Sequence, residues 1–228
     1  ARFRVGWKYL PRLLVTLVAS AFNTIMSLPE RVLAPFLIRH AVPPPVFIVG
    51  MHRSGTTHLH NLLAMDPQFR APRNFEVFNP HGFLTGWLTT AVLAPALSWR
   101  RPMDAVPMQV FSPQEEEFAL AGMCGYSPYW LFGFPRQLGH HRYWLTAEFT
   151  PSELRRWARH YRRFLQNITL WKRCRPLLKN PANTGRVAEL SATFPGAKFI
   201  HIHRHPHAAY RSNVHLAREG LVVFQLQD

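Results

Sequence analysis

The feature that most constrains the fold is a short apolar run followed by a glycine-flanked loop and a helical pattern. The run occupies residues 46–49 and reads Val-Phe-Ile-Val, and the loop, here called the glycine loop, spans residues 50–55 between two glycines. An apolar run of this length is typical of a strand that is buried on both faces. Leu59, Leu62 and Leu63 then follow at helical spacing. A buried strand, a tight loop and a helix predict a parallel sheet covered by helices.

The second half of the chain continues this alternation. Apolar runs predict strands at 177–179 and 197–203. Helices are expected over about 150–168, over about 183–194, and from Pro206 onwards. The clearest of them begins with Thr-Pro-Ser-Glu at 150–153, which is a capping box with proline at the first helical position. The pattern predicts an α/β protein, a P-loop-type three-layer fold with a central parallel sheet flanked by helices.

The first part of the chain has a different character. Arg2, Arg4, Lys8 and Arg12 precede an apolar stretch at 13–25 that several polar residues interrupt. Such a stretch is too short and too polar for a good membrane span, but it suits either a helix at a membrane surface or a helix packed on the domain. We therefore expect an amphipathic helical segment over 1–42 and a single domain over 43–228. Peripheral membrane contact through the N-terminal segment is one of the two interpretations.

The charge balance indicates an anionic partner. Lysine and arginine number 27 against 12 acidic residues, which gives a formal charge of +15. This excess suits nucleic acid, an acidic membrane, or a phosphorylated or sulfated ligand. A nucleic-acid-binding module that uses the arginines at 155–163 is one alternative, although no stacking aromatic motif accompanies them. Cys124 and Cys174 form no paired motif, so zinc ribbons and thioredoxin-like sites are excluded.

The glycine loop narrows this choice. Its Gly-x4-Gly spacing is that of a phosphate-binding P-loop, yet Thr56 stands where a nucleoside triphosphatase has lysine. Arg53 supplies a cation from inside the loop instead. Together with the amides at a helix N-terminus and the hydroxyls of Ser54, Thr56 and Thr57, it would surround one tetrahedral anion. A P-loop kinase or NTPase-like protein is disfavoured but stays an alternative.

Two strings resemble a known family. Residues 45–59 read Pro-Val-Phe-Ile-Val-Gly-Met-His-Arg-Ser-Gly-Thr-Thr-His-Leu and resemble the 5′-phosphosulfate loop of sulfotransferases that use 3′-phosphoadenosine 5′-phosphosulfate (PAPS). The Arg-Ser-Gly-Thr-Thr form is similar to bacterial enzymes and tyrosylprotein sulfotransferases. Residues 194–213 resemble the family's 3′-phosphate element, with Arg204 after a strand and Ser212 on the next helix. The strings at 100–104, 112–120 and 178–181 also resemble family segments, so the likeness spans roughly 45–215.

The resemblance implies a function and a set of site residues. It implies transfer of a sulfuryl group from PAPS to a hydroxyl or amine acceptor, in line and without a metal. Lys179 would stabilise the sulfuryl or bridging oxygen, and Arg53 would contribute to catalysis as well as binding. The expected donor-binding residues are His52, Arg53, Ser54, Gly55, Thr56, Thr57, Arg204 and Ser212. Family members continue with further helices, so the resemblance also implies that part of the domain beyond Asp228 is missing here.

The acceptor side is less defined. A glutamate after the glycine-loop helix serves as general base in similar enzymes, and Glu76 lies at about that distance, with Glu115, Glu116, Glu117 and His81 as competitors. The alternating histidines at 201–207 are not expected to bind a metal, because imidazoles along one strand face diverge. We expect a small-molecule, glycan or lipid acceptor, no nucleic acid, and a cytoplasmic location with membrane association left open.

Overall fold

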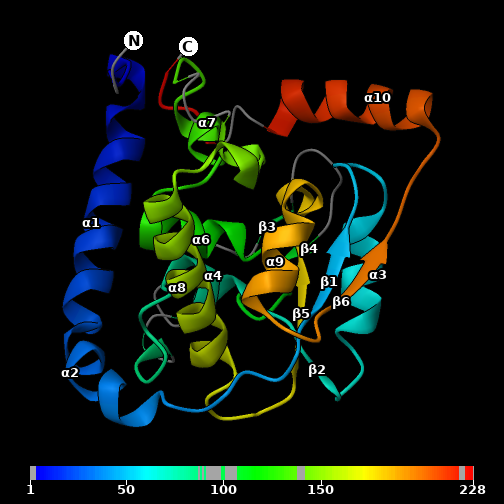
Figure 1. Cartoon of the computed structure of the whole chain (residues 1–228). Helices are drawn as coiled ribbons and strands as arrows, with labels where there is room; N and C mark the ends of the chain where they lie inside the picture. The colour runs from blue at the N-terminus through cyan, green and yellow to red at the C-terminus, as the bar shows by residue number, and fades with distance from the viewer. Residues whose placement is uncertain are drawn as a thin grey trace.

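The structure is a computed structural model that describes residues 4–86, 88, 90, 99–100, 107–137, 142–220 and 224–227. Along the chain, most helices connect or follow the strands of one sheet. In space these helices lie on both sides of the sheet (Figure 1). In chain order the helical elements are η1 (Trp7–Tyr9), α1 (Leu10–Met26), α2 (Leu28–Leu37), α3 (Thr56–Leu63), α4 (Asn74–Phe78), α6 (Glu117–Cys124), α7 (Trp130–Gly133), η3 (Thr146–Glu148), α8 (Pro151–Ile168), η4 (Pro181–Arg186), α9 (Val187–Thr193), α10 (Pro206–His215) and η5 (Leu216–Gly220). Residues 101–104, which belong to one of the family-like strings, lie outside the described residues.

The central sheet is parallel and has four strands in the order β2-β5-β1-β6. The strands are β1 (Val46–Val49), β2 (Phe69–Arg70), β5 (Arg175–Lys179) and β6 (Lys198–His201). The predicted first strand lies between β5 and β6, and Phe47 stands opposite Leu178 and Phe199. The α/β class and the parallel sheet predicted from the sequence are confirmed.

Alternate residues of β1 face two different helical layers, because successive side chains of a strand point to opposite faces. Phe47 and Val49 pack in a large core with buried residues of α6, α8 and α9. Val46 and Ile48 face the other way and are covered by Leu59 and Leu63 of α3 and by Ala64 directly after it. All four residues of β1 are buried, which explains its uninterrupted apolar sequence. The expected three layers are therefore present.

Helix α8 follows its sequence signals closely. The Thr150 side chain accepts a hydrogen bond from the Glu153 amide, which completes the predicted capping box. Trp157, Tyr161 and Phe164 are buried against the core, whereas the arginines of this helix are exposed or half-buried. The arginine cluster is thus the solvent face of an amphipathic helix.

Several elements differ from the sequence-based expectations. The helix expected over 183–194 is a 3₁₀ helix, η4, followed by α9. Gly185 of η4 lies so close to Trp144 that a Cβ atom would come within 2.8 Å of the Trp144 carbonyl oxygen. Strand β2 and the antiparallel pair β3 (Trp99–Arg100) and β4 (Pro107–Met108) were not predicted, because two-residue strands leave no readable periodicity. The segment 67–145 otherwise contains the short helices expected there.

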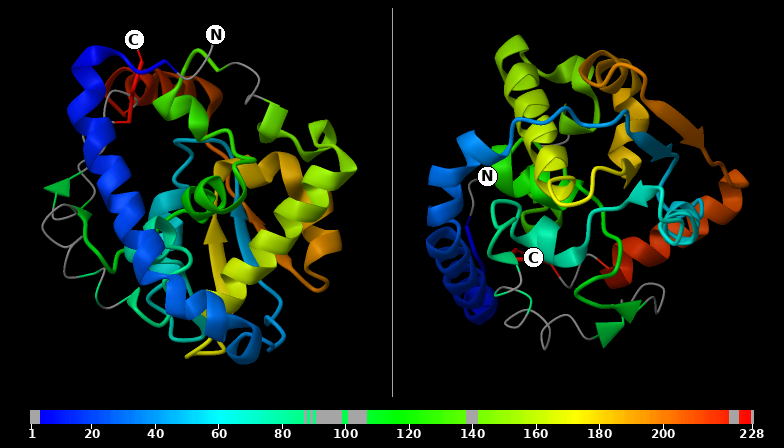
Figure 2. Two further views of the ribbon diagram at one scale, coloured as in Figure 1. Left: turned by 90° about the vertical axis from the view of Figure 1, so that its left-hand side faces the viewer. Right: turned by 90° about the horizontal axis from the view of Figure 1, so that it is seen from below.

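The N-terminal helices lie along the outside of the domain (Figures 1 and 2). The backbone amide of Gly6 donates to the Leu226 carbonyl at 2.9 Å, so residues near the two ends of the described chain lie side by side. The helical stretch Trp7–Met26 has 20 residues, and an 18-residue part of it has a mean hydropathy of 1.3 and no buried residues, so by length and composition alone it could cross a membrane. The helices η1, α1 and α2 lie within the range 1–42, where the sequence predicted an amphipathic helical segment.

Candidate active site

The glycine loop turns between the end of β1 and the start of α3. Gly50, Arg53 and Gly55 adopt positive φ angles of 148°, 68° and 101°. A Cβ atom on Gly50 would lie 2.3 Å from the Ile202 carbonyl oxygen, so only glycine fits where the loop passes the end of β6. The amide at position 50 donates to the Thr184 hydroxyl at 2.9 Å. These contacts hold the loop against two other segments of the sheet edge.

The glycine loop meets the second family-like element directly. The Arg53 Nε atom donates to the Ser212 Oγ atom at 2.9 Å, and Arg204 Nη1 donates to the Arg53 carbonyl oxygen at 3.2 Å. Asn213 Nδ2 adds a bond to the His52 carbonyl oxygen at 3.0 Å. Residues more than 150 positions apart in the sequence thus form one cluster of cations and hydroxyls. Of the predicted donor residues, the structure brings together His52, Arg53, Arg204 and Ser212.

The hydroxyl groups of the glycine loop differ in their surroundings. Ser54 is buried, and its Oγ atom donates to the Met51 carbonyl oxygen at 2.8 Å. Thr56 is buried as the first residue of α3, and Thr57 is half-buried beside it. Since both threonines occupy the N-terminal turn of α3, their amides lie where a helix offers unpaired donors to an anion.

Lys179 lies at the end of β5, next to the strand that leads into the glycine loop. Its ammonium group forms an ion pair with Glu115, and the Tyr129 hydroxyl donates to the same carboxylate. Lys179 is only 2% exposed, so the pair is shielded from water. Burial works against the ionised form of Glu115, but Lys179 and His52 outweigh it and lower the pKa of this carboxyl. Glu115 therefore stays ionised and holds the lysine in place.

His52 interacts electrostatically with Glu115, Lys179 and Arg53. Burial lowers the pKa of this imidazole; Lys179 and Arg53 lower it further, and Glu115 partly opposes them. The ring also makes an edge contact with Trp144, with 5.5 Å between the ring centroids. A neutral imidazole at neutral pH is the consequence.

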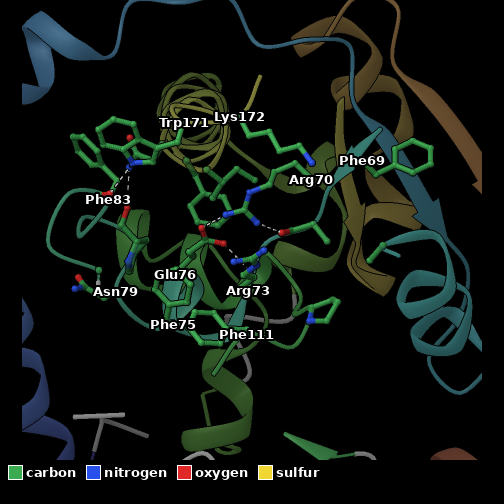
Figure 3. A pocket seen from close by; sticks show the side chains of 18 of the residues that line it. Phe69, Arg70, Arg73, Phe75, Glu76, Asn79, Phe83, Phe111, Trp171 and Lys172 are labelled. Carbon is green, nitrogen blue, oxygen red and sulfur yellow. Dashed lines mark hydrogen bonds and ion pairs between the residues drawn. The ribbon is translucent and has the colours of Figure 1, made fainter. Parts of the chain in front are cut away.

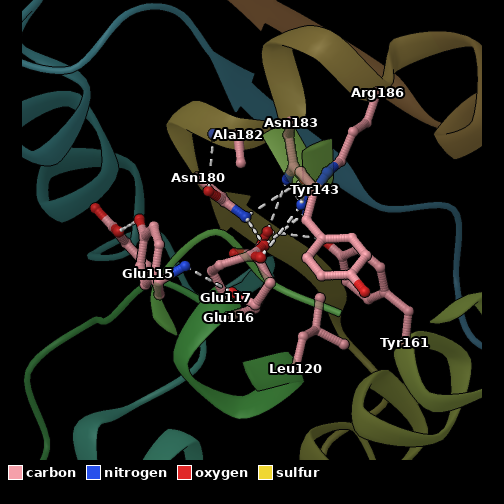
Figure 4. A network of polar contacts seen from close by, with 12 residues as sticks. Glu115, Glu116, Glu117, Leu120, Tyr143, Tyr161, Asn180, Ala182, Asn183 and Arg186 are labelled. Carbon is pink, nitrogen blue, oxygen red and sulfur yellow. Dashed lines mark hydrogen bonds and ion pairs between the residues drawn. The ribbon is translucent and has the colours of Figure 1, made fainter. Parts of the chain in front are cut away.

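The two glutamates after Glu115 belong to a buried polar network (Figure 4). Glu117 pairs with Arg186 at 2.7 Å, and both side chains are fully buried. Glu116 accepts bonds from the Tyr161 hydroxyl at 2.6 Å and from Asn183 Nδ2 at 2.7 Å, while burial raises its pKa. The network ties α6 to α8 and to η4, the segment that follows Lys179. It accounts for the acidic string at 115–117, whose partners the sequence did not reveal.

Glu76 lies in α4 and lines a cavity of about 950 Å³, here called the aromatic cavity (Figure 3). Its carboxylate pairs with Arg70 and accepts a bond from the Arg73 amide at 2.8 Å. Burial raises the pKa of Glu76, although the two arginines pull in the opposite direction. The described lining residues of this cavity include none from the glycine loop. The cavity therefore reaches α3 at Asn61 rather than at the glycine loop itself.

The walls of the aromatic cavity combine rings with unsatisfied amides. Its aromatic members are Phe69, Phe75, Phe83, Phe111, Phe164 and Trp171. Asn61 Oδ1, Asn79 Nδ2 and Asn167 Oδ1 are buried and have no hydrogen-bond partner among the described residues. Because buried polar atoms normally have partners, these amides suit a bound molecule with polar groups.

A short connection joins the aromatic cavity to Lys179. The amide of Gln114 donates to the Pro72 carbonyl oxygen at 2.8 Å, which places the chain before Arg73 beside the residue that precedes Glu115. Glu115 in turn pairs with Lys179. The backbone beside the cavity thus runs next to the segment that carries the partner of Lys179. His81, the remaining competitor, is partly buried, and burial lowers its pKa.

Three residues of the site were not singled out from the sequence. Thr184 fixes Gly50, Asn213 fixes His52, and Tyr129 shares Glu115 with the buried lysine. The position of Asn213, directly after the predicted Ser212, is the one signal that could have identified it from the sequence. Within the described residues no group of three or more His, Cys, Asp or Glu side chains lies close enough to hold a metal ion.

Comparisons with known proteins agree with the site geometry. Residues 44–228 match the Sulfotransferase family. The omega-hydroxy-beta-dihydromenaquinone-9 sulfotransferases Stf3 of Mycobacterium bovis and Mycobacterium tuberculosis are each 38% identical over 187 residues, covering 81% of this chain and 48% of theirs. The chain thus spans about half the length of the curated relatives it matches.

Two solved structures share the fold. Sulfotransferase STF9 from Mycobacterium avium has a TM-score of 0.66 and 23% identity, covering 83% of this chain and 50% of that one. Sulfotransferase STF1 from Mycobacterium tuberculosis H37Rv has a TM-score of 0.56 and 22% identity, covering 78% and 50%. The family match spans most of the chain and includes both of the motifs that meet at Arg53, so this chain belongs to the sulfotransferase family.

Proposed function

We propose that the chain binds PAPS and transfers its sulfuryl group to a hydroxyl acceptor. The observation that supports this proposal is that Arg53 forms hydrogen bonds with Ser212 and Arg204. These bonds bring two candidate anion-binding elements together at the carboxyl edge of a parallel sheet. In the reaction, the acceptor oxygen forms a bond to sulfur as the bond from sulfur to the phosphate oxygen breaks. The acceptor proton goes to a base, and 3′-phosphoadenosine 5′-phosphate leaves.

The donor-binding roles follow from the positions of the charges. Arg53, the amides at the start of α3 and the Thr56 and Thr57 hydroxyls would hold the 5′-phosphosulfate. Arg204 and Ser212 would hold the 3′-phosphate, and His52, Ser54 and Gly55 shape the loop between them. Since the transferred group carries less charge than a phosphoryl group, these donors suffice in our proposal without a metal ion.

Lys179 is proposed to stabilise the charge that develops on the leaving oxygen. Its ion pair with Glu115 fixes the ammonium group at the end of β5, and the buried setting strengthens its field. A buried pair of this kind loses much of its value when one partner is removed, because the other charge is left without compensation. We therefore regard Glu115 as a positioning residue for Lys179.

Glu76 is the general base in this proposal. A base works best when its pKa lies near the working pH, and burial raises the pKa of Glu76 while neighbouring charges lower that of Glu115. Glu76 also lines a cavity of a size suited to a ligand. Arg70 holds the carboxylate in a fixed orientation. The acceptor would enter the aromatic cavity with its hydroxyl directed toward Glu76.

The acceptor that we favour is a lipid-like alcohol. The Stf3 proteins are named for a hydroxylated dihydromenaquinone, and the aromatic cavity of this chain offers rings and a few polar amides to a similar molecule. An apolar acceptor of this kind is found in membranes, so we propose a cytoplasmic protein that works at the membrane surface. Glycans and other small alcohols are less suited to walls with so many rings.

A thermal-shift titration tests the donor site. We expect 3′-phosphoadenosine 5′-phosphate to raise the unfolding temperature of the chain at concentrations at which ADP and AMP do not, because only the first carries a 3′-phosphate for Arg204 and Ser212. The titration is run without added metal ions and again with magnesium. An equal shift with all three nucleotides, or a shift that requires magnesium, would favour a kinase or NTPase-like protein and contradict the proposal.

A further inference from the structure

The N-terminal helices present apolar side chains to solvent along their outer side. The members of this apolar outer face are each more than half exposed: Trp7, Leu10, Leu14, Leu17, Val18, Ile25, Leu28, Val32 and Phe36. Positions 7, 10, 14, 17 and 18 recur at the spacing of one helical stripe. Soluble domains rarely leave an apolar surface of this extent uncovered, so the face requires a partner.

The opposite side of the same helices is attached to the domain along its length. Arg12 Nη1 donates to the Gln225 carbonyl oxygen at 2.7 Å, and Asn23 Nδ2 donates to the Phe78 carbonyl oxygen at 3.2 Å. Just before η1 the amide of Gly6 donates to the Leu226 carbonyl oxygen at 2.9 Å. A helix that crossed a bilayer would lose all three bonds and expose their polar groups to lipid. The attached arrangement fits a helix that lies in the plane of a surface.

The charges around the apolar outer face have one sign. The exposed basic residues Arg4 and Lys8 lie at its beginning, and Arg31 and Arg39 lie toward its end; these four are here called the basic rim. Glu30 is the only carboxylate in the first 40 residues, and it is 1% exposed. A basic rim without exposed carboxylates is complementary to anionic lipid headgroups. It is poorly suited to a second copy of the chain, which would bring the same cations together.

We propose that α1 and α2 dock on an anionic membrane, with the apolar outer face in the headgroup region and the basic rim on the lipid phosphates. Glu30 connects this surface to the aromatic cavity. Its carboxylate accepts hydrogen bonds from the amides of Phe83, Leu84 and Thr85, and Phe83 and Leu84 line the cavity. Docking thus brings one wall of the cavity to the membrane. Delivery of a lipid acceptor rests on the proposed function, whereas the docking itself does not.

Vesicle flotation tests the docking. The chain is mixed with vesicles of phosphatidylcholine alone or of equal parts phosphatidylcholine and phosphatidylglycerol. We expect the chain to float with the anionic vesicles and to do so less as salt rises, since salt screens the basic rim. The double variant Leu14→Gln, Val18→Gln should bind the anionic vesicles at least about tenfold more weakly, because it removes two apolar side chains from the lipid contact.

The matched control is the double variant Leu145→Gln, Val187→Gln, which changes two exposed apolar side chains outside α1 and α2. It should float like the parent, and both variants should keep the thermal shift with 3′-phosphoadenosine 5′-phosphate. No flotation of the parent, equal flotation of both double variants, or binding that is insensitive to salt would overturn the inference. A dimer in light scattering that the Leu14 and Val18 changes dissociate, without vesicle binding, would assign the face to a second copy instead. Flotation without a nucleotide shift would support docking and contradict the proposed function.

Discussion

The glycine loop and the aromatic cavity form two parts of the candidate site, and they are built in different ways. The loop is defined by backbone geometry: Gly50 and Gly55 adopt positive φ angles, and α3 begins directly after them. The cavity is defined by side chains from the end of α3, from the segment 69–86 and from the end of α8. A site built from backbone has a recognisable sequence motif, whereas a site built from side chains can change its ligand without changing the fold.

The Glu76→Gln variant should show the largest difference between the two regions. We expect turnover to fall by about 10²- to 10⁴-fold, because a glutamine side chain cannot take the proton from the hydroxyl group of the acceptor molecule. Binding of 3′-phosphoadenosine 5′-phosphate should be unchanged, since the glycine loop does not depend on Glu76. Steady-state kinetics and a thermal-shift titration measure the two effects. Glu189→Gln, which alters a half-buried glutamate of α9 away from both regions, is the control.

The pH profile of kcat/KM separates Glu76 from Glu115. The base must be ionised, so activity is lost as pH falls through its pKa. Because the pKa of Glu76 is raised, we expect this acid limb above the ordinary glutamate value of 4.5. A limb below that value, together with full activity of Glu76→Gln, would assign the base to Glu115, whose pKa is lowered.

The Arg204→Ala variant should have an intermediate effect, confined to the donor side. We expect the affinity for 3′-phosphoadenosine 5′-phosphate to fall by roughly 10- to 150-fold, as hydrogen bonds to charged groups are worth about 1.5–3 kcal/mol. The affinity for ADP should hardly change, because ADP lacks the 3′-phosphate. Calorimetric titration gives both values. Arg211→Ala removes an exposed arginine next to Ser212 on the same helix, and an equal loss there would show that only general charge matters.

The Ala64→Phe variant should have the smallest effect on catalysis. Ala64 lines the aromatic cavity and also packs beside the core under β1, so a phenyl ring there would occupy part of the cavity and lower the stability of the domain somewhat. For a long-chain alcohol acceptor we expect KM to rise by about tenfold while nucleotide affinity stays constant. Ala192→Phe, on the exposed side of α9, should leave both unchanged. A KM unaffected by Ala64→Phe would place the acceptor elsewhere.

The sequence predicted the strand, the glycine loop and the helix that follows it because local rules govern them. The strand at 46–49, the loop glycines and the capping box at Thr150 each produce a pattern over a few neighbouring residues, and the resemblance added Arg204 and Ser212. Long-range contacts left no such pattern. Nothing near Lys179 indicates that its partner is Glu115, 64 residues earlier. The same holds for the bond between Asn183 and Glu116 and for the cavity amides, whose neighbours are set by packing.

Glu30 affects where this protein can be divided. Glu30 lies outside the segment 44–228 that matches the family. Its carboxylate nevertheless accepts hydrogen bonds from three backbone amides and from the Thr85 hydroxyl inside that segment. A shortened protein beginning at residue 44 would leave these four donors without their acceptor, and the turn at 83–85 would lose its anchor. The protein should therefore not be shortened to the residues that match the family model. An expression fragment intended to retain the aromatic cavity should include α2.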